Sequence, residues 1–339
     1  MVSRRSGALV FAWLAAVLTP AAGHADTLQS VQQRGVLHCA IHPGQTGMSF
    51  LDARGEWRGF FVDYCRALAA AALRDPARVK FLPTASNKRF AVLQTGEVDV
   101  LSRTTTLTYT RDTSLGLDFT GVMYYDGQSF LVRRDSGVRR AEDLDGATIC
   151  ITKGTTAELN TADWFQRKRL RFRSLVFENA EESKIAFFAR RCDAMTTDAL
   201  ALTVVRLADS PRPDDYVVLE EFLSKEPLGP AVRANDARWF DLNRWLLNAL
   251  IAAEELGITT SNAAEMRVRS PNPEVRRLLG GEPGIGEPLG LDDEWALRAI
   301  QAVGNYGELY ARYVGPLGVA RGLNRLQAEG GLMYALPFR

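Results

Sequence analysis

Two stretches of the chain repeat the same order of elements, and this repeat constrains the fold more than any other feature. Residues 35–102 read as a short apolar strand, a helix, a strand, a helix and a third strand. Residues 147–198 repeat that order. Strands that alternate with helices in this way are typical of a parallel sheet with helices packed on it. We therefore expect an α/β protein made of two similar units.

The third strand of each unit ends in a polar, hydroxyl-rich segment. Thr104 and Thr106 follow the strand in "GEVDVLSRTTT", and Asp198 closes the strand in "RRCDAMTTD". Thr155 and Thr156 follow the first strand of the second unit. Ligands of open α/β sheets bind beyond the carboxyl ends of the strands. These five side chains are therefore predicted to line a binding crevice.

Composition excludes several other classes of protein. With 339 residues, 46% hydrophobic and 24% charged, the chain is an ordinary globular protein long enough for two domains. A formal net charge of +1, without a basic cluster interleaved with aromatics, argues against nucleic acid as a partner. His38 and His42 are the only histidines after residue 25, so we expect neither a zinc site nor a cofactor.

Residues 1–25 have the pattern of a signal peptide. Arg4 and Arg5 precede an apolar run over 7–18, which is too short to span a bilayer. Pro20 and the small residues before Ala25 then indicate cleavage after Ala25. The alternative is a membrane anchor. We expect a cleaved signal peptide and a periplasmic protein.

Five stretches together resemble the periplasmic solute-binding proteins of amino-acid ABC transporters, in particular the general L-amino-acid-binding subgroup. They read "GEVDVLSRTTTLTYTRDTSLGLDFTGVMYYDGQSFLV", "KGTTAELNTADWF", "CDAMTTD", "SKEPLGPAVR" and "AVGNYGE". The resemblance implies a two-lobed type II periplasmic-binding-protein fold, whose lobes are joined by two crossing strands. We expect the signal peptide over 1–25, lobe 1 over 26–127 and 226–339, and lobe 2 over 128–225. The helical segments of 259–339 should pack onto lobe 1.

The same resemblance assigns roles to the polar residues at the strand ends. It implies that Arg111 grips the α-carboxylate of an amino acid and that Asp198 takes the α-ammonium group. Thr104 and Thr106 would hold both groups, and the turn with Thr155 and Thr156 would direct backbone amides at the carboxylate; no metal or catalytic residue is implied. A guanidinium matches a carboxylate with two parallel hydrogen bonds, and helix starts attract anions.

Each assignment has a structural alternative. Arg111 could be a surface arginine paired with Asp112, and Asp198 could cap the helix that follows it. The chain also departs from the subgroup pattern at Phe61, Thr104 and Leu107, near the part of the site that would meet the ligand side chain. The preferred side chain is therefore left open.

The resemblance implies a transport receptor that acts as a monomer and delivers L-amino acids to an inner-membrane ABC permease. One alternative is a periplasmic enzyme on the same fold, similar to a dehydratase, because fold alone does not fix function. Glu158 is the acidic residue that could then act in the crevice, although the start of a helix explains it equally well. Another is a sensory module, which would usually carry a transmembrane segment.

The four cysteines suggest two disulfides in an oxidising compartment, where three pairings are possible. The alternative is four buried thiols. A bridge between lobes would lock the hinge that ligand binding requires. We therefore expect one bridge between Cys39 and Cys65 and a second between Cys150 and Cys192.

Overall fold

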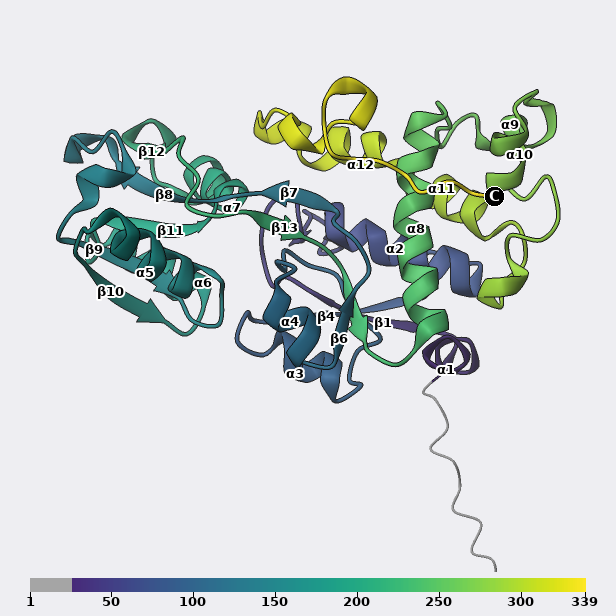
Figure 1. Ribbon diagram of the computed structural model, residues 1–339, viewed down its shortest axis with the longest axis horizontal. Helices are drawn as coiled ribbons and strands as arrows, with labels where there is room; N and C mark the ends of the chain where they lie inside the picture. Colours follow the sequence, from purple (N-terminus) through teal and green to yellow (C-terminus); the bar gives the residue numbers. More distant parts are fainter. Residues whose placement is uncertain (1–25) are drawn as a thin grey trace, which may run out of the picture.

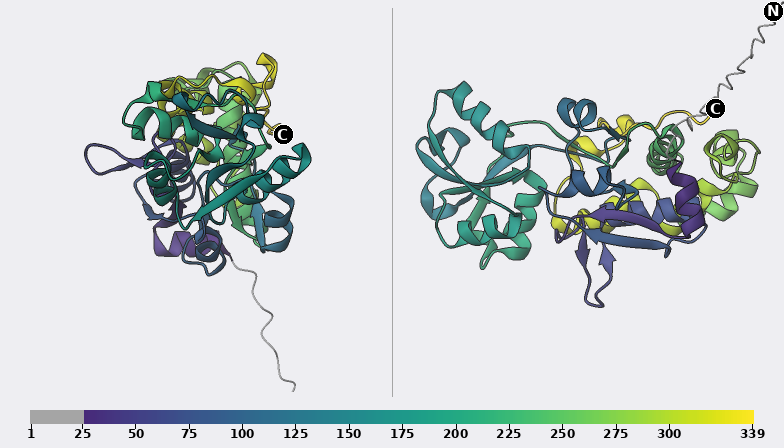
Figure 2. Two further views of the ribbon diagram at one scale, coloured as in Figure 1. Left: turned by 90° about the vertical axis from the view of Figure 1, so that its left-hand side faces the viewer. Right: turned by 90° about the horizontal axis from the view of Figure 1, so that it is seen from below.

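The structure is a computed structural model and describes residues 26–339, so the predicted signal peptide lies outside the described residues. The chain forms two lobes that lie side by side and are joined by two thin strands (Figures 1 and 2). Within residues 26–339, no helix combines the length and apolar character needed to cross a membrane.

The first lobe is built on a mixed five-stranded sheet. Its order is β4 (Val79–Pro83), β1 (Leu37–Ile41), β5 (Val100–Leu101), β14 (Ala231–Arg233) and β6 (Leu117–Phe119). The strands β1, β4 and β5 are parallel, as the repeat predicts, whereas β14 is antiparallel to both its neighbours. The chain enters β14 on its return from the second lobe, which explains the reversed direction. Around this sheet lie α1 (Thr27–Arg34), α2 (Phe60–Leu73), α3 (Arg89–Gln94), α4 (Tyr109–Ser114) and the hairpin of β2 (Phe50–Leu51) and β3 (Trp57–Arg58).

The second lobe repeats this plan with a second five-stranded sheet. Its order is β10 (Phe172–Phe177), β9 (Ala147–Thr152), β11 (Ala194–Asp198), β8 (Gln128–Arg133) and β12 (Tyr216–Val218). The strands β9, β10 and β11 are parallel, and β8 is antiparallel to β11 and β12. Its helices are α5 (Ala157–Lys168), α6 (Ala180–Phe188) and α7 (Ala199–Val204). The carboxyl ends of β9 and β11 lead into α5 and α7, where the predicted polar residues lie.

Two short strands connect the lobes. β7 (Tyr124–Asp126) carries the chain into the second lobe, and β13 (Glu226–Leu228) carries it back. They pair antiparallel, with Glu226 opposite Asp126 and Leu228 opposite Tyr124. Within residues 26–339, the chain passes between the two sheets only through this ribbon, an arrangement typical of hinged domains.

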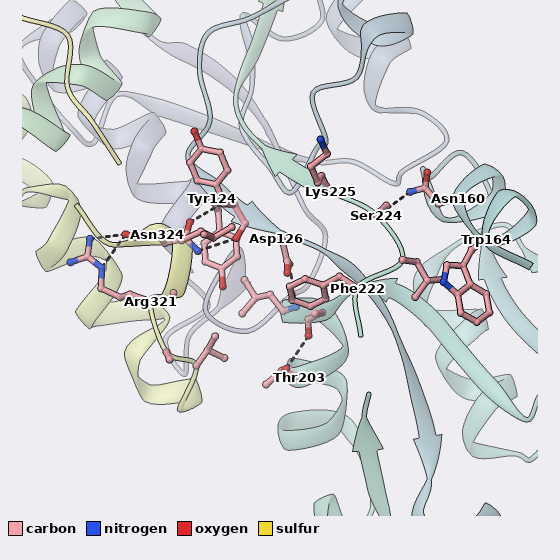
Figure 3. Close-up of a pocket in the computed structure, with 18 of the residues that line it drawn as sticks. Tyr124, Asp126, Asn160, Trp164, Thr203, Phe222, Ser224, Lys225, Arg321 and Asn324 are labelled. Carbon is pink, nitrogen blue, oxygen red and sulfur yellow. Dashed lines mark hydrogen bonds between the residues drawn. The ribbon is translucent and has the colours of Figure 1, made fainter. Parts of the chain in front are cut away.

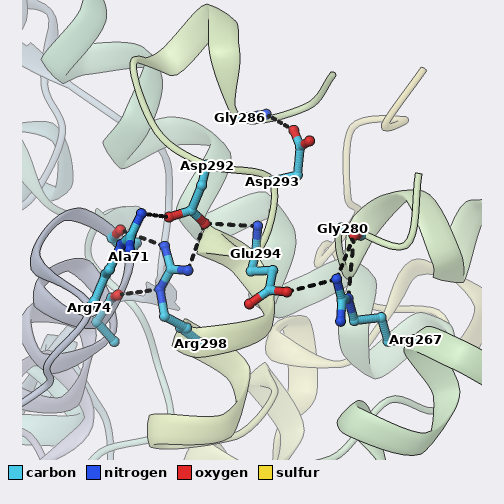
Figure 4. Close-up of polar contacts among 10 residues, drawn as sticks. Ala71, Arg74, Arg267, Gly280, Gly286, Asp292, Asp293, Glu294 and Arg298 are labelled. Atoms are coloured by element: carbon cyan, nitrogen blue, oxygen red, sulfur yellow. Dashed lines mark hydrogen bonds and ion pairs between the residues drawn. The ribbon is translucent and has the colours of Figure 1, made fainter. Parts of the chain in front are cut away.

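The C-terminal helices pack against the first lobe. They are α8 (Ala237–Glu255), α9 (Ala263–Arg269), α10 (Pro273–Leu278), α11 (Trp295–Val303) and α12 (Tyr306–Tyr313). Trp295 of α11 is buried in the same hydrophobic core as α2. At the edge of that core, Asp292 accepts a hydrogen bond from Arg298 at 2.6 Å and pairs with Arg74 at 2.6 Å (Figure 4). Arg298 also donates to the carbonyl oxygen of Ala71 at 3.3 Å, so these polar contacts hold the start of α11 against the end of α2.

The four cysteines form two disulfides, each within one lobe. Cys39 of β1 is bonded to Cys65 of α2, with their Cα atoms 6.4 Å apart. Cys150 of β9 is bonded to Cys192, which precedes β11, with their Cα atoms 5.6 Å apart. This is the pairing expected from the sequence. Neither bridge crosses the ribbon of β7 and β13, so no disulfide links one lobe to the other within residues 26–339.

Candidate ligand-binding site

A cavity of about 550 Å³ lies between the lobes, at the carboxyl ends of their strands. Of the six residues predicted to bind ligand, five line it: Thr104, Thr106, Thr155, Thr156 and Asp198. The threonines numbered 104 and 106 come from the first lobe, and the other three residues come from the second. The topology therefore brings together side chains that the sequence places in separate units.

Asp198 is the last residue of β11 and borders the cavity with a free carboxylate. Across residues 26–339 no hydrogen bond or ion pair reaches its carboxylate oxygens, and it makes no side-chain cap to α7. Asp198 therefore stands at the N-cap position of α7, but its side chain does not cap the helix. Burial, followed by repulsion from Asp126 and Glu226, raises the pKa of Asp198 well above its ordinary value. A cationic group of a ligand would relieve this repulsion.

Arg111 lies on α4 and, unlike the other five, is not among the cavity-lining residues. Its Nη1 donates to the carbonyl oxygen of Thr106 at 2.9 Å, and its guanidinium lies over the ring of Phe90, 5.2 Å from the ring centre. Burial lowers the pKa of Arg111, while Glu226 and Asp198 act in the opposite direction. We call the first-lobe residues that line the cavity, which lie between His42 and Thr106, the first-lobe wall. The guanidinium of Arg111 lies behind this wall and within electrostatic reach of the carboxylates of Glu226 and Asp198.

The threonine hydroxyls are already engaged within the protein. Thr104 donates to Oε1 of Gln45 at 3.2 Å, and Thr155 donates to the carbonyl oxygen of Thr152 at 2.7 Å. Thr156 precedes α5 and offers no side-chain cap to it. Thr155, Thr156 and Ala157 line the cavity, so the positive end of α5 borders it, where an anion is favoured.

Glu226 of β13 is the central polar residue that the sequence analysis missed. Its side chain is 1% exposed, and one oxygen, Oε2, accepts hydrogen bonds from Thr106 of the first lobe and from Thr156 of the second, the latter at 2.9 Å. The other oxygen, Oε1, accepts from Asn160 and from Ser224, both at 2.7 Å. The carboxylate therefore links a residue of the first lobe to a residue of the second. The stretch "SKEPLGP" carried the family resemblance but gave no signal of this role.

Two arginines on the first-lobe wall were also missed. Arg89 begins α3 and Arg103 follows β5, and both line the cavity. Burial lowers the pKa of Arg103 to about 9 and that of Arg89 well below its ordinary value. Burial and these two cations also lower the pKa of His42, a further lining residue. Within the part of the chain that the structure describes, no cluster of potential metal ligands occurs.

The lobes touch at the rim of the cavity. Nη2 of Arg89 donates to the carbonyl oxygen of Gly154 across the cleft at 3.1 Å. Beside it, Nδ2 of Asn87 donates to Glu178 at 3.0 Å. Gly154 is so close that a Cβ atom added to it would lie 3.1 Å from the Cα atom of Asn87. The first-lobe wall and the turn before α5 thus form a closed lip.

A larger cavity of about 840 Å³ adjoins the connecting strands (Figure 3). It is bordered by Tyr125 of β7, by Phe222, which is 60% exposed, and by the C-terminal segment 319–324. Asn324 fixes that segment to β7, because it accepts from the amide of Tyr125 at 2.7 Å and donates to its carbonyl oxygen at 3.0 Å. None of the six predicted residues lines this cavity, whereas five of them line the smaller one.

Two α/β lobes on a two-strand hinge, with a polar cavity at the strand ends, define a type II periplasmic binding protein. The chain belongs to the bacterial extracellular solute-binding proteins, family 3, whose profile matches residues 37–279. The sequence prediction of fold and family is confirmed.

Known relatives match nearly the whole chain. The general L-amino acid-binding periplasmic protein of Rhizobium johnstonii is 49% identical, over 94% of this chain and 94% of its own length. The glutamate/glutamine/aspartate/asparagine-binding protein of Rhodobacter capsulatus is 48% identical, over 96% of each chain. A periplasmic binding protein from Brucella ovis, solved with glutathione bound, has a TM-score of 0.90 and 50% identity, covering 93% of this chain and 100% of that one.

Proposed function

We propose that this protein is a periplasmic receptor that binds L-amino acids by their α-carboxylate and α-ammonium groups and delivers them to an ABC-type membrane permease. The fold and the near full-length similarity to amino-acid-binding proteins support the class. The observation that carries the proposal is the carboxylate of Asp198, which faces the cavity without a partner among residues 26–339.

The two ends of an amino acid would meet opposite charges in this cavity. Asp198 would accept hydrogen bonds from the α-ammonium group. The amides at the start of α5 would receive the α-carboxylate, with Arg111 as the cation behind the wall. Arg111 has five N–H groups and uses one on Thr106, which leaves donors for a carboxylate. Since these groups come from both lobes, a bound amino acid would favour the state in which the lobes meet.

Calorimetric titration of the purified protein with L-amino acids tests this proposal. Asp198→Asn keeps the shape but removes the charge that balances the ammonium group, and Arg111→Met removes the guanidinium. A buried charge left without its partner costs several kcal/mol, so each variant should lose about 100-fold in affinity at about 1.4 kcal/mol per tenfold.

Ligand analogues and a control variant complete the experiment. An analogue without the amino group and one without the carboxyl group should both fail to bind the wild-type protein. Asp163→Asn, on the exposed face of α5, should bind like wild type. If Asp198→Asn bound an L-amino acid within about threefold of wild type, a difference below 1 kcal/mol, the role of Asp198 would be wrong.

The enzyme alternative gains no support from the site. Glu158, its proposed acid, accepts a hydrogen bond from the amide of Gly154 at 3.0 Å and so stabilises the turn before α5. An ancestral amino acid-binding protein described as a precursor of cyclohexadienyl dehydratase is 30% identical with a TM-score of 0.56, but it covers 68% of this chain. Incubation of the protein with an amino acid, followed by analysis of the recovered ligand, should return it unchanged.

A further inference from the structure

Two buried cations on the first-lobe wall have no counter-ion. The side chains of Arg89 and Arg103 are 3% and 2% exposed, and neither takes part in an ion pair with any residue from 26 to 339. Arg89 donates only to the carbonyl oxygen of Gly154, and Arg103 only to the carbonyl oxygen of Thr84 and the hydroxyl of Ser86. Burial of a charge without a partner is strongly unfavourable, so such a pair needs an explanation.

Three N–H donor groups of this wall also lack an acceptor. Nε of Arg89, Nε of Arg103 and Nε2 of Gln45 are all buried and make no hydrogen bond with the described part of the chain. Gln45 is 7% exposed, and its oxygen accepts a hydrogen bond from the hydroxyl of Thr104 at 3.2 Å. All three side chains line the same cavity. Buried donors are nearly always satisfied in native proteins, so they point to an acceptor that occupies the cavity.

The other charges that line the cavity or lie beside it do not supply this acceptor. At its mouth, Lys184 pairs with Glu181 at 2.6 Å and with Asp209 at 3.0 Å, so that group is balanced. The carboxylate of Glu226 already accepts four hydrogen bonds from threonine, serine and asparagine side chains. Asp198 acts to raise the pKa of both Arg89 and Arg103, but it makes no ion pair with either and is the carboxylate proposed for the α-ammonium group. The first-lobe wall thus keeps an excess of positive charge.

We propose that Arg89, Arg103 and Gln45 form a second anion subsite, which binds a carboxylate that the ligand carries in addition to its α-carboxylate. The inference rests on the proposed function, in which Asp198 and the start of α5 hold the α-groups. It names the ligand class as L-amino acids with an acidic side chain or γ-linked peptides of them. A cavity of about 550 Å³ lies within the roughly 300–1,000 Å³ range of sites for drug-sized ligands, which leaves room for either.

Paired titrations of L-glutamate and L-glutamine test the subsite. The two ligands share the same α-groups and nearly the same shape, so the ratio of their dissociation constants reports the charge of the side chain alone. Gln45→Glu keeps the acceptor for Thr104 but places a carboxylate in the subsite. We expect it to reduce the preference for glutamate over glutamine at least tenfold, and Arg103→Met to do the same.

Gln45→Glu also controls for folding, and one further variant controls for general charge. Gln45→Glu introduces a counter-ion for buried arginines, so it should fold even if Arg103→Met does not. Arg54→Met removes an exposed arginine of the same lobe and should leave the preference unchanged. In a second arm, γ-L-glutamylglycine is compared with its C-terminal amide. If Gln45→Glu reduced the preference for the charged ligand in this arm alone, the subsite would bind the terminal carboxylate of a peptide. If it reduced the preference for glutamate over glutamine, the subsite would bind a side-chain carboxylate.

The failure of this inference can be separated from the failure of the proposed function. If the wild-type protein bound no L-amino acid or γ-glutamyl peptide, the proposed function would be wrong. The wild-type protein could instead bind them while Gln45→Glu changed the preference for glutamate over glutamine, and for γ-L-glutamylglycine over its amide, by no more than about threefold. The subsite would then be wrong and the receptor function would stand.

Discussion

Glu226 should contribute to stability through a carboxylate that no neutral side chain can replace. In Glu226→Gln, an amide nitrogen takes the place of one carboxylate oxygen. The variant can keep Oε1 for Asn160 and Ser224, while Thr106 and Thr156 lose the acceptor Oε2. Those two threonines belong to different lobes, so the substitution acts on the contact that joins them.

The expected magnitude follows from the two lost hydrogen bonds. A hydrogen bond to a charged group contributes about 1.5–3 kcal/mol, so loss of both would cost roughly 3–6 kcal/mol. Both hydroxyls can rotate and accept a hydrogen bond from the new amide, which recovers part of this energy. We therefore expect Glu226→Gln to lower the free energy of unfolding by about 2–3 kcal/mol.

Urea unfolding, followed by circular dichroism, measures this difference directly. Glu220→Gln is the matched control, because Glu220 is exposed and six residues away on the same connection, and it should change stability by less than about 0.5 kcal/mol. A loss of less than 0.5 kcal/mol for Glu226→Gln as well would refute the reasoning, because it would show that the threonines do not depend on the carboxylate.

Two further predictions concern pH and the rim of the cleft. Burial, followed by repulsion from Asp126 and Glu226, raises the pKa of Asp198 well above its ordinary value, so ligand binding to its ionised form releases a proton. Burial also raises the pKa of Asp126 to about 7; Asp126 does not line the ligand cavity, so its raised pKa bears on folding stability alone. Ligand affinity should therefore fall as pH falls from 8 to 5.5, by at most about tenfold per pH unit for one linked proton. Folding stability has the opposite dependence, because the contribution of a raised carboxyl pKa falls as pH rises from about 4 to 7. Calorimetry in buffers of different ionisation enthalpy should detect the released proton, and an affinity that did not change with pH would contradict the linkage. Gly154→Ala should cost about 1–2 kcal/mol of stability at its positive φ and also weaken ligand binding about tenfold, because its Cβ would meet Asn87 across the cleft. Gly146→Ala, at a similar positive φ with open space around it, should lose stability but keep its affinity, and equal affinities for the two variants would exclude a role for this lip.

The parts of the fold that local patterns encode could be predicted. The repeat of strands and helices over 147–198 predicts a helix after its first strand, and α5 follows β9 in the structure. The antiparallel direction of β14 could not be predicted in this way, because it depends on pairing with β6, a strand more distant in the sequence. Strand direction in such a sheet is set by the route of the whole chain.

The site residues that were predicted have a local signal in the sequence, and those that were missed depend on contacts with distant residues. Asp198 and the threonines stand directly at strand ends, where topology alone indicates a ligand. Glu226 acquires its role from Thr106, which lies 120 residues away in the sequence, and nothing near Glu226 signals that contact. Arg103 is missed for another reason. In the sequence it cannot be told from a surface arginine, and only its burial without an ion pair indicates that it could bind an anion.

The discontinuous first lobe imposes an order on folding. The cores of the second lobe draw on residues between 130 and 223, one uninterrupted stretch of chain. The core of the first lobe instead combines residues from Leu28 to Phe338, so its sheet and helices cannot be completed until almost the entire chain is present. Contacts of such long sequence separation form slowly, because the intervening loop must close first. The middle of the chain is therefore the part that can fold early, and the two ends must find each other around it.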